Sequence, residues 1–505
     1  MRDFFRFILL FSCILMQPVA VSGQGDLVFT PSSKTRLFPE LRGEEVIVRE
    51  WTGGNYVVHV RDADYPYRHY FLLEKTLNDQ VVGFSFDLQL NDVGYVTLYV
   101  NDMQLYGDSC YFCGEAVIDQ GAPVVLPDGT VLVPRFVSYG FVGRFGMADT
   151  VGGSWRLDYR LIQDVDRLLQ MAVYHPNEEL AGFKLMVVAT AEAGNLNSPS
   201  CLVEIKESSN MNWGYRVLQT ETVGLIFTDV LARGNDLFVS SHMECSDNPD
   251  DVEHWIHYVH HSWCGGFWET HASFNFVENA TKVDSRYMDP SGYGWGWHRS
   301  DTPMRMCMMN GDTFCLSYTV LNWSTGEHGV IFHPMLTEFV GFVPRLYYDC
   351  CDANLCEIVY SPLSDMMTVL MQGQGTVIYP WYVTTNKWST LLMGAVGYMS
   401  DMKLESLCRR GGRSFYMGGH GETDHKARVV TQQVMAMEPG HDFCFSERRF
   451  VGATVLDAPF IDKRVFRWKK EVIVGSFNWS SMTGTVGAVG YSIPCFYPWQ
   501  PSAEF

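Results

Sequence analysis

The chain has 505 residues, of which 47% are hydrophobic and 14% aromatic, so it can bury a sizeable core and is not disordered. Its formal net charge of −20 at pH 7 lacks the basic footprint of proteins that bind nucleic acid or anionic membrane surfaces, so we expect neither partner. With 14 cysteines at low density, the chain is too large for a small disulfide scaffold. We expect no cofactor.

The first 23 residues have the pattern of a secretory signal peptide. Two arginines open it, an apolar run covers Phe7–Met16, and small residues lead to Gly23. We therefore expect a mature chain of residues 24–505 that is secreted, periplasmic or on the cell surface. Two alternatives stay open, an uncleaved N-terminal anchor and a lipoprotein acylated at Cys13. No later segment reaches the roughly 18 uncharged apolar residues of a membrane span.

Short apolar strands alternate with Gly, Asn or Asp turns along the rest of the chain, and helical periodicity is nearly absent. A tight hairpin needs positive φ at its centre, which these three residues tolerate. The clearest copies are Met103–Cys113, Val230–Val239 and Met306–Leu316. The expected turns lie near residues 54, 108, 177, 235, 311, 364, 411 and 470.

The spacing of these turns predicts an all-β repeat fold in one domain, residues 24–505. The gaps average about 59 residues, and a four-stranded propeller blade takes roughly 40 to 50. The sequence therefore predicts a β-propeller of six to eight blades, with seven favoured, in which the longer gaps hold insertions. The alternatives are a pair of β-sandwiches, for which the sequence shows no linker, and a β-helix, whose period would be shorter.

One stretch carries a family resemblance. The segment Asn101–Gly114 (NDMQLYGDSCYFCG), followed by Gly140–Phe145 (GFVGRF), resembles blades of secreted bacterial β-propeller-like repeat proteins of unassigned function. The resemblance implies the fold and an extracytoplasmic location, but it assigns no catalytic residues. Within it, Cys110 and Cys113 stand three apart in an expected strand. We expect their sulfurs on opposite faces, which argues against a redox or zinc pair.

The widest gap between turns predicts an insertion around residues 245–300, rich in His and Trp. Insertions on one face of a repeat array often form the binding face. Exposed aromatic rings between glycines stack on sugar rings or hold peptide chains. The alternative is that the rings pack between blades. The expected ligand-binding residues are Trp263, Tyr293, Trp295, Trp297 and His298.

The same region contains a run of histidines, in which His254, His257 and His261 are the candidate metal ligands. On a helix the three would align, whereas on a strand His257 and His261 share one face and His254 lies on the other. The run is not His-Glu-x-x-His, which excludes that zinc protease pattern. The alternative is a solvated aromatic loop without metal.

A second polar cluster follows near the C-terminal end of the repeats. It contains His420, Glu422, Asp424 and His425 in a glycine-rich segment. Such groups could bind a metal or perform acid–base chemistry. A polar turn between blades is the simpler interpretation.

No nucleophile elbow, phosphate loop or dinucleotide fingerprint is present, so the catalytic residues, if any, are unknown. Two functions remain. The first is an exported non-catalytic binding or scaffold protein that uses one propeller face for an extracellular glycan or protein. The second is a carbohydrate-active hydrolase or lyase with its site in the central cleft. Paired carboxylates at one end of the central channel would favour the enzyme.

Overall fold

The computed structural model describes most strands of the chain and the turns between some of them. The described residues are 33–51, 55–65, 67–75, 80–87, 89–90, 94–119, 136–146, 155–174, 184–190, 200–207, 213–222, 225–233, 236–244, 252–261, 268–275, 295–296, 304–310, 313–322, 328–336, 345–349, 354–361, 366–372, 376–380, 393–398, 402–410, 414–433, 447–456, 462–464, 467–469, 473–487 and 493–495. The expected signal peptide lies outside them.

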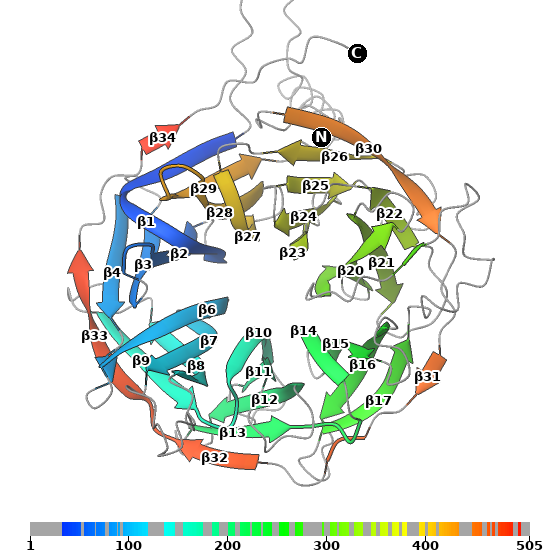
Figure 1. Cartoon of the computed structure of the whole chain (residues 1–505), viewed down its shortest axis with the longest axis horizontal. Helices are drawn as coiled ribbons and strands as arrows, with labels where there is room; N and C mark the ends of the chain where they lie inside the picture. Colours follow the sequence, from blue (N-terminus) through cyan, green and yellow to red (C-terminus); the bar gives the residue numbers. More distant parts are fainter. Residues whose placement is uncertain are drawn as a thin grey trace, which may run out of the picture.

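All regular structure in these residues is β-strand, which confirms the predicted all-β class. The part of the chain described here contains no helix with the length and apolar character needed to cross a membrane. The strands form a propeller-like ring, in which antiparallel runs of four strands point outward from a common centre (Figure 1).

The first strand of each run lies nearest the centre of the ring and is called here an inner strand (Figure 1). The inner strands are β1 (Ser33–Trp51), β6 (Gly94–Tyr106), β10 (Arg167–Tyr174), β14 (Leu225–Arg233), β19 (Arg305–Asn310), β23 (Asn354–Ser361) and β27 (Met402–Arg410).

The second and third strands of the runs follow outward, each antiparallel to the one before. The second strands are β2 (Asn55–Asp62), β7 (Ser109–Asp119), β11 (Lys184–Thr190), β15 (Asp236–Glu244), β20 (Thr313–Asn322), β24 (Met366–Gln372) and β28 (Ser414–Gly421). The third strands are β3 (Arg68–Lys75), β8 (Phe136–Gly146), β12 (Ser200–Glu207), β16 (Val252–His261), β21 (His328–Leu336), β25 (Thr376–Pro380) and β29 (Lys426–Gln433).

The fourth strands complete the runs at the outer side of the ring. They are β4 (Gln80–Asp87), β9 (Trp155–Ile162), β13 (Trp213–Leu218), β17 (Trp268–Asn275), β22 (Arg345–Asp349) and β26 (Met393–Tyr398). Two short strands lie at the inner edges, β5 (Gln89–Leu90) beside β6 and β18 (Trp295–Gly296) beside β20.

The first seven predicted turn positions all fall between an inner strand and the second strand of its run. At the β6–β7 hairpin, Gly107 has φ of 56°, the left-handed conformation that the sequence pattern required. The eighth position, near residue 470, does not join such a pair. It falls between short strands that follow the last run, so the regular spacing of turns ends at β27 and β28.

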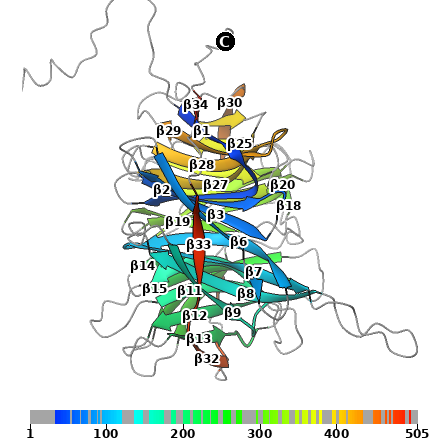
Figure 2. The ribbon, with the colours of Figure 1, turned by 90° about the vertical axis from the view of Figure 1, so that its left-hand side faces the viewer.

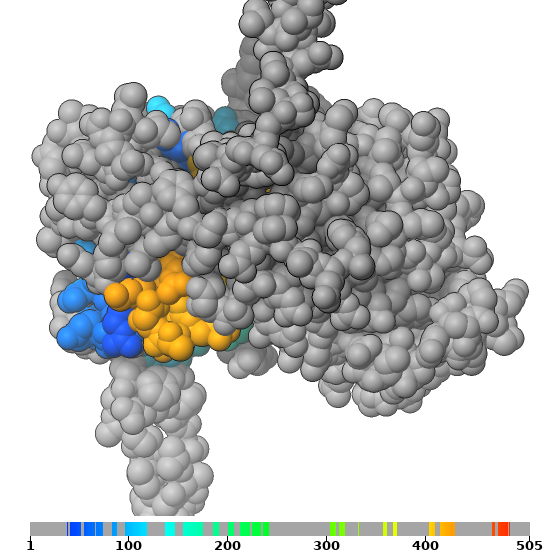
Figure 3. Space-filling view, turned by 90° about the horizontal axis from the view of Figure 1, so that it is seen from above, coloured from blue at the N-terminus to red at the C-terminus, as the bar shows by residue number. Residues whose placement is uncertain are grey.

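The first strand, β1, closes the ring by belonging to two runs. Residues 33–42 pair with β29 as the outer strand of the last run, and residues 43–51 pair with β2 as the inner strand of the first. At the crossing, the backbone N–H of Gly43 donates to the carbonyl of His425 at 2.8 Å. Figure 3 shows residues of the last run (orange) side by side with the N-terminal residues (blue) on this surface.

The C-terminal belt, residues 447–495, adds a fifth strand to the outer edges of the runs (Figures 1 and 2). It visits them in reverse chain order, and two of its strands each join two neighbouring runs. The belt consists of β30 (Glu447–Leu456) on β26 and β22, β31 (Asp462–Arg464) on β17, β32 (Ile473–Phe477) on β13, β33 (Ser480–Gly487) on β9 and β4, and β34 (Ile493–Cys495) on β1.

The hydrophobic core lies between neighbouring runs, where the faces of two sheets meet. Between the first two runs, Phe71, Phe84, Phe112 and Trp155 are buried and in ring contact. Gly143 lies against the ring of Phe112, where an added Cβ would approach ring atoms to 2.2 Å. This close approach explains one of the glycines in the GFVG motif.

About a third of the expected insertion at 245–300 is regular sheet. The histidine run forms β16 and Trp268 begins β17, the third and fourth strands of the run that starts at β14. Their alternating bulky residues suit a pleated sheet. The wide gap between turns therefore comes mainly from residues 276–303, most of which lie outside the described residues.

Candidate functional site

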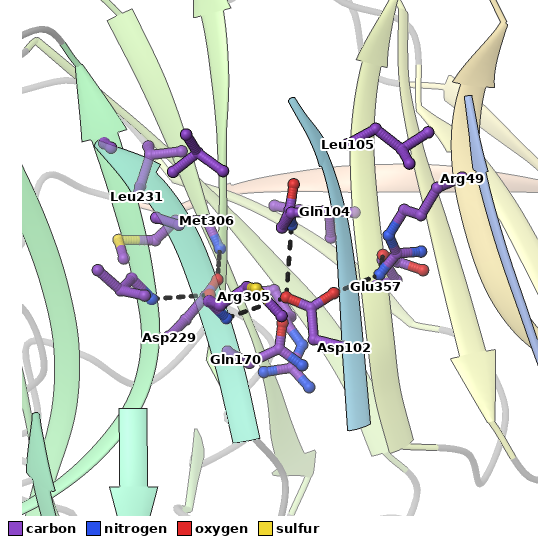
Figure 4. Close-up of a pocket in the computed structure, with 16 residues that line it drawn as sticks. Arg49, Asp102, Gln104, Leu105, Gln170, Asp229, Leu231, Arg305, Met306 and Glu357 are labelled. Atoms are coloured by element: carbon purple, nitrogen blue, oxygen red, sulfur yellow. Dashed lines mark hydrogen bonds and ion pairs between the residues drawn. The ribbon is translucent and has the colours of Figure 1, made fainter. Parts of the chain in front are cut away.

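A pocket of about 310 Å³ lies at the centre of the ring, between the inner strands (Figure 4). Its size is at the lower end of the range for small-molecule sites. Charged and amide side chains line it together with aliphatic ones. The lining residues that matter below are Arg49, Asp102, Gln104, Gln170, Asp229, Arg305 and Glu357, with Leu105, Leu231 and Ile358 among the apolar ones.

A β-bulge recurs on the inner strands at this depth. In each case the register shifts by one residue, and the residue after the shift is polar. A bulge turns the strand locally and aims a side chain in a new direction. The polar residues at these positions are Asp102, Gln170, Asp229, Glu357 and Ser406.

The carboxylates at the bulges hold the neighbouring inner strands. Asp102 accepts a hydrogen bond from the backbone N–H of Met171 at 3.0 Å, and Asp229 accepts one from Met306 at 2.7 Å. Glu357 accepts one from Leu407 at 2.7 Å. These N–H groups belong to inner edges, where no further strand supplies a partner, so a side chain must.

The same device continues to the point of ring closure. The carboxylate of Glu405 and the hydroxyl of Ser406, both on β27, accept hydrogen bonds from the backbone N–H groups of Val46 and Val48 at 2.7 and 2.8 Å. Side chains of the last run thus bind the inner half of β1. Hydrogen bonds from a side chain on one inner strand to the backbone of the next therefore recur at several places around the ring.

Arg49 connects three inner strands across the pocket. Its guanidinium lies 2.8 Å from Asp102 and 2.9 Å from Glu357, and its Nε donates to the carbonyl of Met103 at 2.8 Å. Burial opposes the charge of Arg49, but Glu357 and Asp102 outweigh it and raise the pKa of Arg49. The side chain is only 14% exposed, so this network is a fixed part of the pocket wall.

Asp229 is a pocket carboxylate whose pKa lies far above its usual value. It is 7% exposed, and burial raises its pKa to about 7, against the opposing effect of Arg305 and two backbone N–H groups. Burial also raises the pKa of Glu357. At neutral pH, Asp229 can therefore take up or release a proton, which most aspartates cannot do there.

The sequence placed none of these residues in a site. Asp102 stands inside the segment used for the family resemblance, and Asp229 directly precedes one of the clearest hairpins, Val230–Val239, yet neither was considered as a site residue. A signal was present. Within three of the expected inner strands an acidic residue interrupts an apolar run five to seven residues before the turn, at Asp102, Asp229 and Glu357.

Most of the expected ligand-binding residues lie outside the described residues, namely Trp263, Tyr293, Trp297 and His298. Trp295 is described only in its backbone, which pairs with Asn322 of β20. The same edge of β20 pairs with β19, which carries Arg305 into the pocket. Trp295 thus lies on the inner edge of its run. At the usual rise per residue of a strand, it is roughly 17 Å along β20 from Arg305.

The candidate metal ligands His254, His257 and His261 lie on β16, which is a strand rather than a helix. Strand alternation puts His257 and His261 on one face and His254 on the other. Their side chains lie outside the description, so the metal site remains a prediction. Among the side chains that are described, no group of three or more His, Cys, Asp or Glu is placed to hold a metal ion.

The second polar cluster surrounds the turn between β28 and β29. His420 is buried, with Nδ1 3.4 Å from Glu405 and its ring stacked at 5.8 Å on His425. Asp424 accepts from the backbone N–H of Lys426 at 3.0 Å and pairs with Arg428 at 3.1 Å. These contacts stabilise a polar turn, as the simpler interpretation expected, but the turn lies within the last run and not between two runs.

Cys110 and Cys113 lie on opposite faces of β7, as their spacing predicted. Cys110 belongs to the core between the first and second runs and Cys113 to the core between the second and third. Both are buried free thiols, and burial raises the pKa of each well above its usual value. They act as small apolar residues rather than as a redox pair.

No protein-family model matches the chain, and no curated protein matches it. Among solved structures, it is similar to Trypanosoma rangeli sialidase in complex with 2,3-difluorosialic acid, at 8% identity and a TM-score of 0.30, over 80% of this chain. The match spans 59% of that sialidase chain, less than two thirds of its length. A Trypanosoma rangeli sialidase mutant displaying trans-sialidase activity matches at 8% identity and a TM-score of 0.26, over 88% of this chain and 96% of that one. At these scores the likeness is weak and carries no argument about function.

Proposed function

We propose that the chain is an exported, non-catalytic binding protein, built as a propeller of seven blades, that holds a glycan in its central pocket. Each run of four strands that begins at an inner strand is one blade, and the first half of β1 supplies the fourth strand of the last blade. The belt then covers the outer edges. This count agrees with the seven turns that join inner and second strands.

The observation that carries the proposal is that the pocket carboxylates are already held by hydrogen bonds and ion pairs. Asp102, Asp229 and Glu357 each bind the backbone of a neighbouring inner strand. Arg49 fixes two of them. Such groups form a rigid polar wall. Hydrogen-bonding groups fixed in advance recognise hydroxyl groups at low entropic cost. Carboxylates already occupied by backbone N–H groups and by Arg49 favour binding over acid–base chemistry in this proposal.

The lining suits a sugar in its mixture of polar and apolar groups. In Figure 4, Gln170, Asp102 and Asp229 lie on one side of the pocket and Leu231 and Leu105 toward the other. A pyranose ring offers hydroxyl groups at its rim and C–H groups on its faces. Trp295 lies on the same inner edge as β19, and Trp295 and Trp297 supply stacking platforms for further sugar units in this proposal.

A glycan-array screen of residues 24–505, followed by calorimetry with the best glycan, tests this function. Replacing Gln104 and Gln170 together by Ala should weaken binding at least tenfold, because two hydrogen-bonding amides of the pocket are lost. The matched control is Gln163→Ala, since Gln163 is exposed in the turn after β9. Unchanged affinity in the double variant would place the site elsewhere, and the absence of any glycan ligand would refute the function.

A second candidate, a glycoside hydrolase or lyase in the same cleft, is favoured by one observation. Asp229, with a pKa of about 7, is protonated in part at neutral pH, as a general acid must be. Turnover of chromogenic glycosides that disappears in Asp229→Asn and falls as the pH rises above about 7 would establish this enzyme. Turnover that is equal in the variant and the wild type would reject Asp229 as the acid.

The proposal that the chain is exported is tested by a separate experiment. The expected signal peptide lies outside the described residues, so N-terminal sequencing of protein recovered from its native compartment is the direct measurement. We expect the mature chain to begin at Gln24 or within a few residues of it. A chain that retains Met1 would contradict an extracytoplasmic location through a cleaved signal.

A further inference from the structure

The charges that line the pocket do not balance. Two guanidinium groups, of Arg49 and Arg305, face three carboxylates, of Asp102, Asp229 and Glu357. Arg49 is committed to Asp102 and Glu357 at 2.8 and 2.9 Å. This leaves Arg305 as the cation that acts on Asp229. The guanidinium of Arg305 also donates a hydrogen bond to the carbonyl of Thr228 at 3.2 Å.

The surroundings of Asp229 leave room for one more positive group. Of the charged groups on the other inner strands, Arg305 on β19 lowers its pKa and Asp102 on β6 raises it, while the residues that β10 contributes to the lining, such as Gln170, are uncharged. Each oxygen of Asp229 accepts one backbone N–H, from Val230 and from Met306. A carboxylate offers about four lone-pair sites, so roughly two remain for a ligand in the pocket.

We propose that the pocket binds the ammonium group of an amino sugar, with Asp229 as its counterion and the amides of Gln104 and Gln170 as partners of the ring hydroxyls. This inference rests on the proposed glycan-binding function and specifies its ligand. A third cation would balance the three carboxylates. With a neutral sugar, Asp229 would stay either ionised without a further cation in a buried site, which is unfavourable, or protonated.

The amino sugar fits better than a bare cation because the pocket is larger than an ion and not uniformly acidic. Leu105, Leu231 and Ile358 supply apolar contacts that a hydrated metal ion would not use. The same residues can cover the C–H face of a sugar ring, while the carboxylate and amides lie within reach of its amine and hydroxyl groups. The ligand class is therefore a glycan that carries free amino groups.

The charge balance couples binding to the protonation of Asp229. Below its pKa of about 7, Asp229 holds a proton that the ammonium must displace to solvent, and above that value the carboxylate is ready to bind. For a ligand that stays protonated, affinity should therefore fall by up to about tenfold for each pH unit below 7.

The test compares the β-1,4 disaccharide of glucosamine with its N,N′-diacetylated counterpart by calorimetry between pH 5.5 and 7, with the mature protein. We expect the free amine to bind about ten to a hundred times more tightly at pH 7, the range of a charge-assisted hydrogen bond. Its affinity should decrease toward pH 5.5. Asp229→Asn should lose both the preference and the pH dependence, whereas the exposed Asp64→Asn should keep them.

The outcomes separate this inference from the function on which it rests. If the acetylated disaccharide binds as tightly as the amine or more tightly, the amino-sugar inference is wrong while glycan binding stands. If the array shows no glycan ligand at all, both fail. Should Asp229→Asn fold poorly, the comparison of the two sugars on the wild type still decides the question, because it needs no variant.

Discussion

The inner and outer edges of the ring are protected in different ways. At the outer side there is space for another strand, and the C-terminal belt pairs its backbone with the fourth strands. At the inner side the strands converge, and in the described residues only the two-residue strands β5 and β18 are added there. There, carboxylates such as Asp102 and Glu357 bind the exposed N–H groups instead. Both solutions satisfy backbone groups that would otherwise be unpaired.

The difference explains where a binding site can form. A belt strand forms backbone hydrogen bonds along an outer edge and leaves no space beside it. At the inner edges, side chains reach toward the neighbouring inner strand and leave a polar space between them. The pocket of about 310 Å³ is what remains among these side chains. The residues that stabilise the inner edge are thus also the residues that a ligand meets.

The largest expected effect comes from removing the belt. Truncation after Gly440, before β30, uncovers the outer edges, and long unpaired edges recruit other chains. We expect aggregation in size-exclusion chromatography, in contrast to the full chain. Truncation after Cys495 keeps every belt strand and is the matched control. A soluble monomer with an unchanged melting temperature after the longer truncation would show that the belt is dispensable.

The stability of the protein should depend nearly as strongly on one residue of the inner edge, Arg49. Arg49→Met removes the cation that neutralises Asp102 and Glu357, and breaking a buried ion pair costs about 3 to 5 kcal/mol. Urea unfolding measures this change in the free energy of unfolding. Arg156→Met, at an exposed arginine paired with Asp158, is the control and should change stability by less than about 1 kcal/mol. Equal effects of both substitutions would contradict the role given to Arg49.

A pair of histidines between the two edges predicts sensitivity to acid. His59 and His69 are buried, with Nε2 of His59 3.0 Å from Nδ1 of His69. Burial, helped by Arg61, lowers the pKa of His59 to about 3, and burial followed by His59 and Arg61 lowers that of His69. Unfolded histidines bind protons near pH 6.5, so the unfolded state gains protons first and stability falls as the pH drops below that value.

Replacing both histidines by Leu should remove this dependence. The wild type should lose up to roughly 1.4 kcal/mol per pH unit for each histidine below pH 6.5, relative to the variant. Asp229 acts in the opposite sense between pH 4 and 7 in both proteins, since its pKa is raised, so the difference between the two isolates the histidines. Denaturation midpoints from pH 7 to 4 give the measurement, and parallel profiles would count against the histidine pair.

The smallest effect on stability is expected from Trp295 and Trp297. Replacing Trp295 and Trp297 by Ala should change the free energy of unfolding by less than about 0.5 kcal/mol if these residues form a surface platform. Glycan binding should weaken by more than about 1 kcal/mol. Thermal melting and calorimetry on the same samples separate the two. A drop of many degrees in the melting temperature would show that the tryptophans pack between blades.

The sequence predicted the hairpins of the four-stranded runs better than the belt. Turn residues such as Gly107 act locally, so their spacing revealed the hairpins between inner and second strands. The belt escaped prediction because β31 and β34 have three residues each, too short for a periodic pattern. The sequence also gave no reason to expect its reverse path. The histidine run was assigned to an insertion because its composition is unusual, although its strand pattern was regular.

The pocket could not have been predicted from spacing. Asp102 meets Met171 and Asp229 meets Met306 across separations of 69 and 77 residues. Such contacts depend on the ring bringing inner strands together. An acid within an apolar strand is also ambiguous, since bulges at edges and active sites both produce it.

The most direct test of the central claim is a crystal structure of residues 24–505 with the glycan that binds most tightly on the array. The account predicts an intact sugar in the central pocket, with hydroxyl or amino groups in hydrogen-bond contact with Gln104, Gln170 and Asp229. A sugar bound on the outer surface of the ring, or a cleaved product in the pocket, would contradict it.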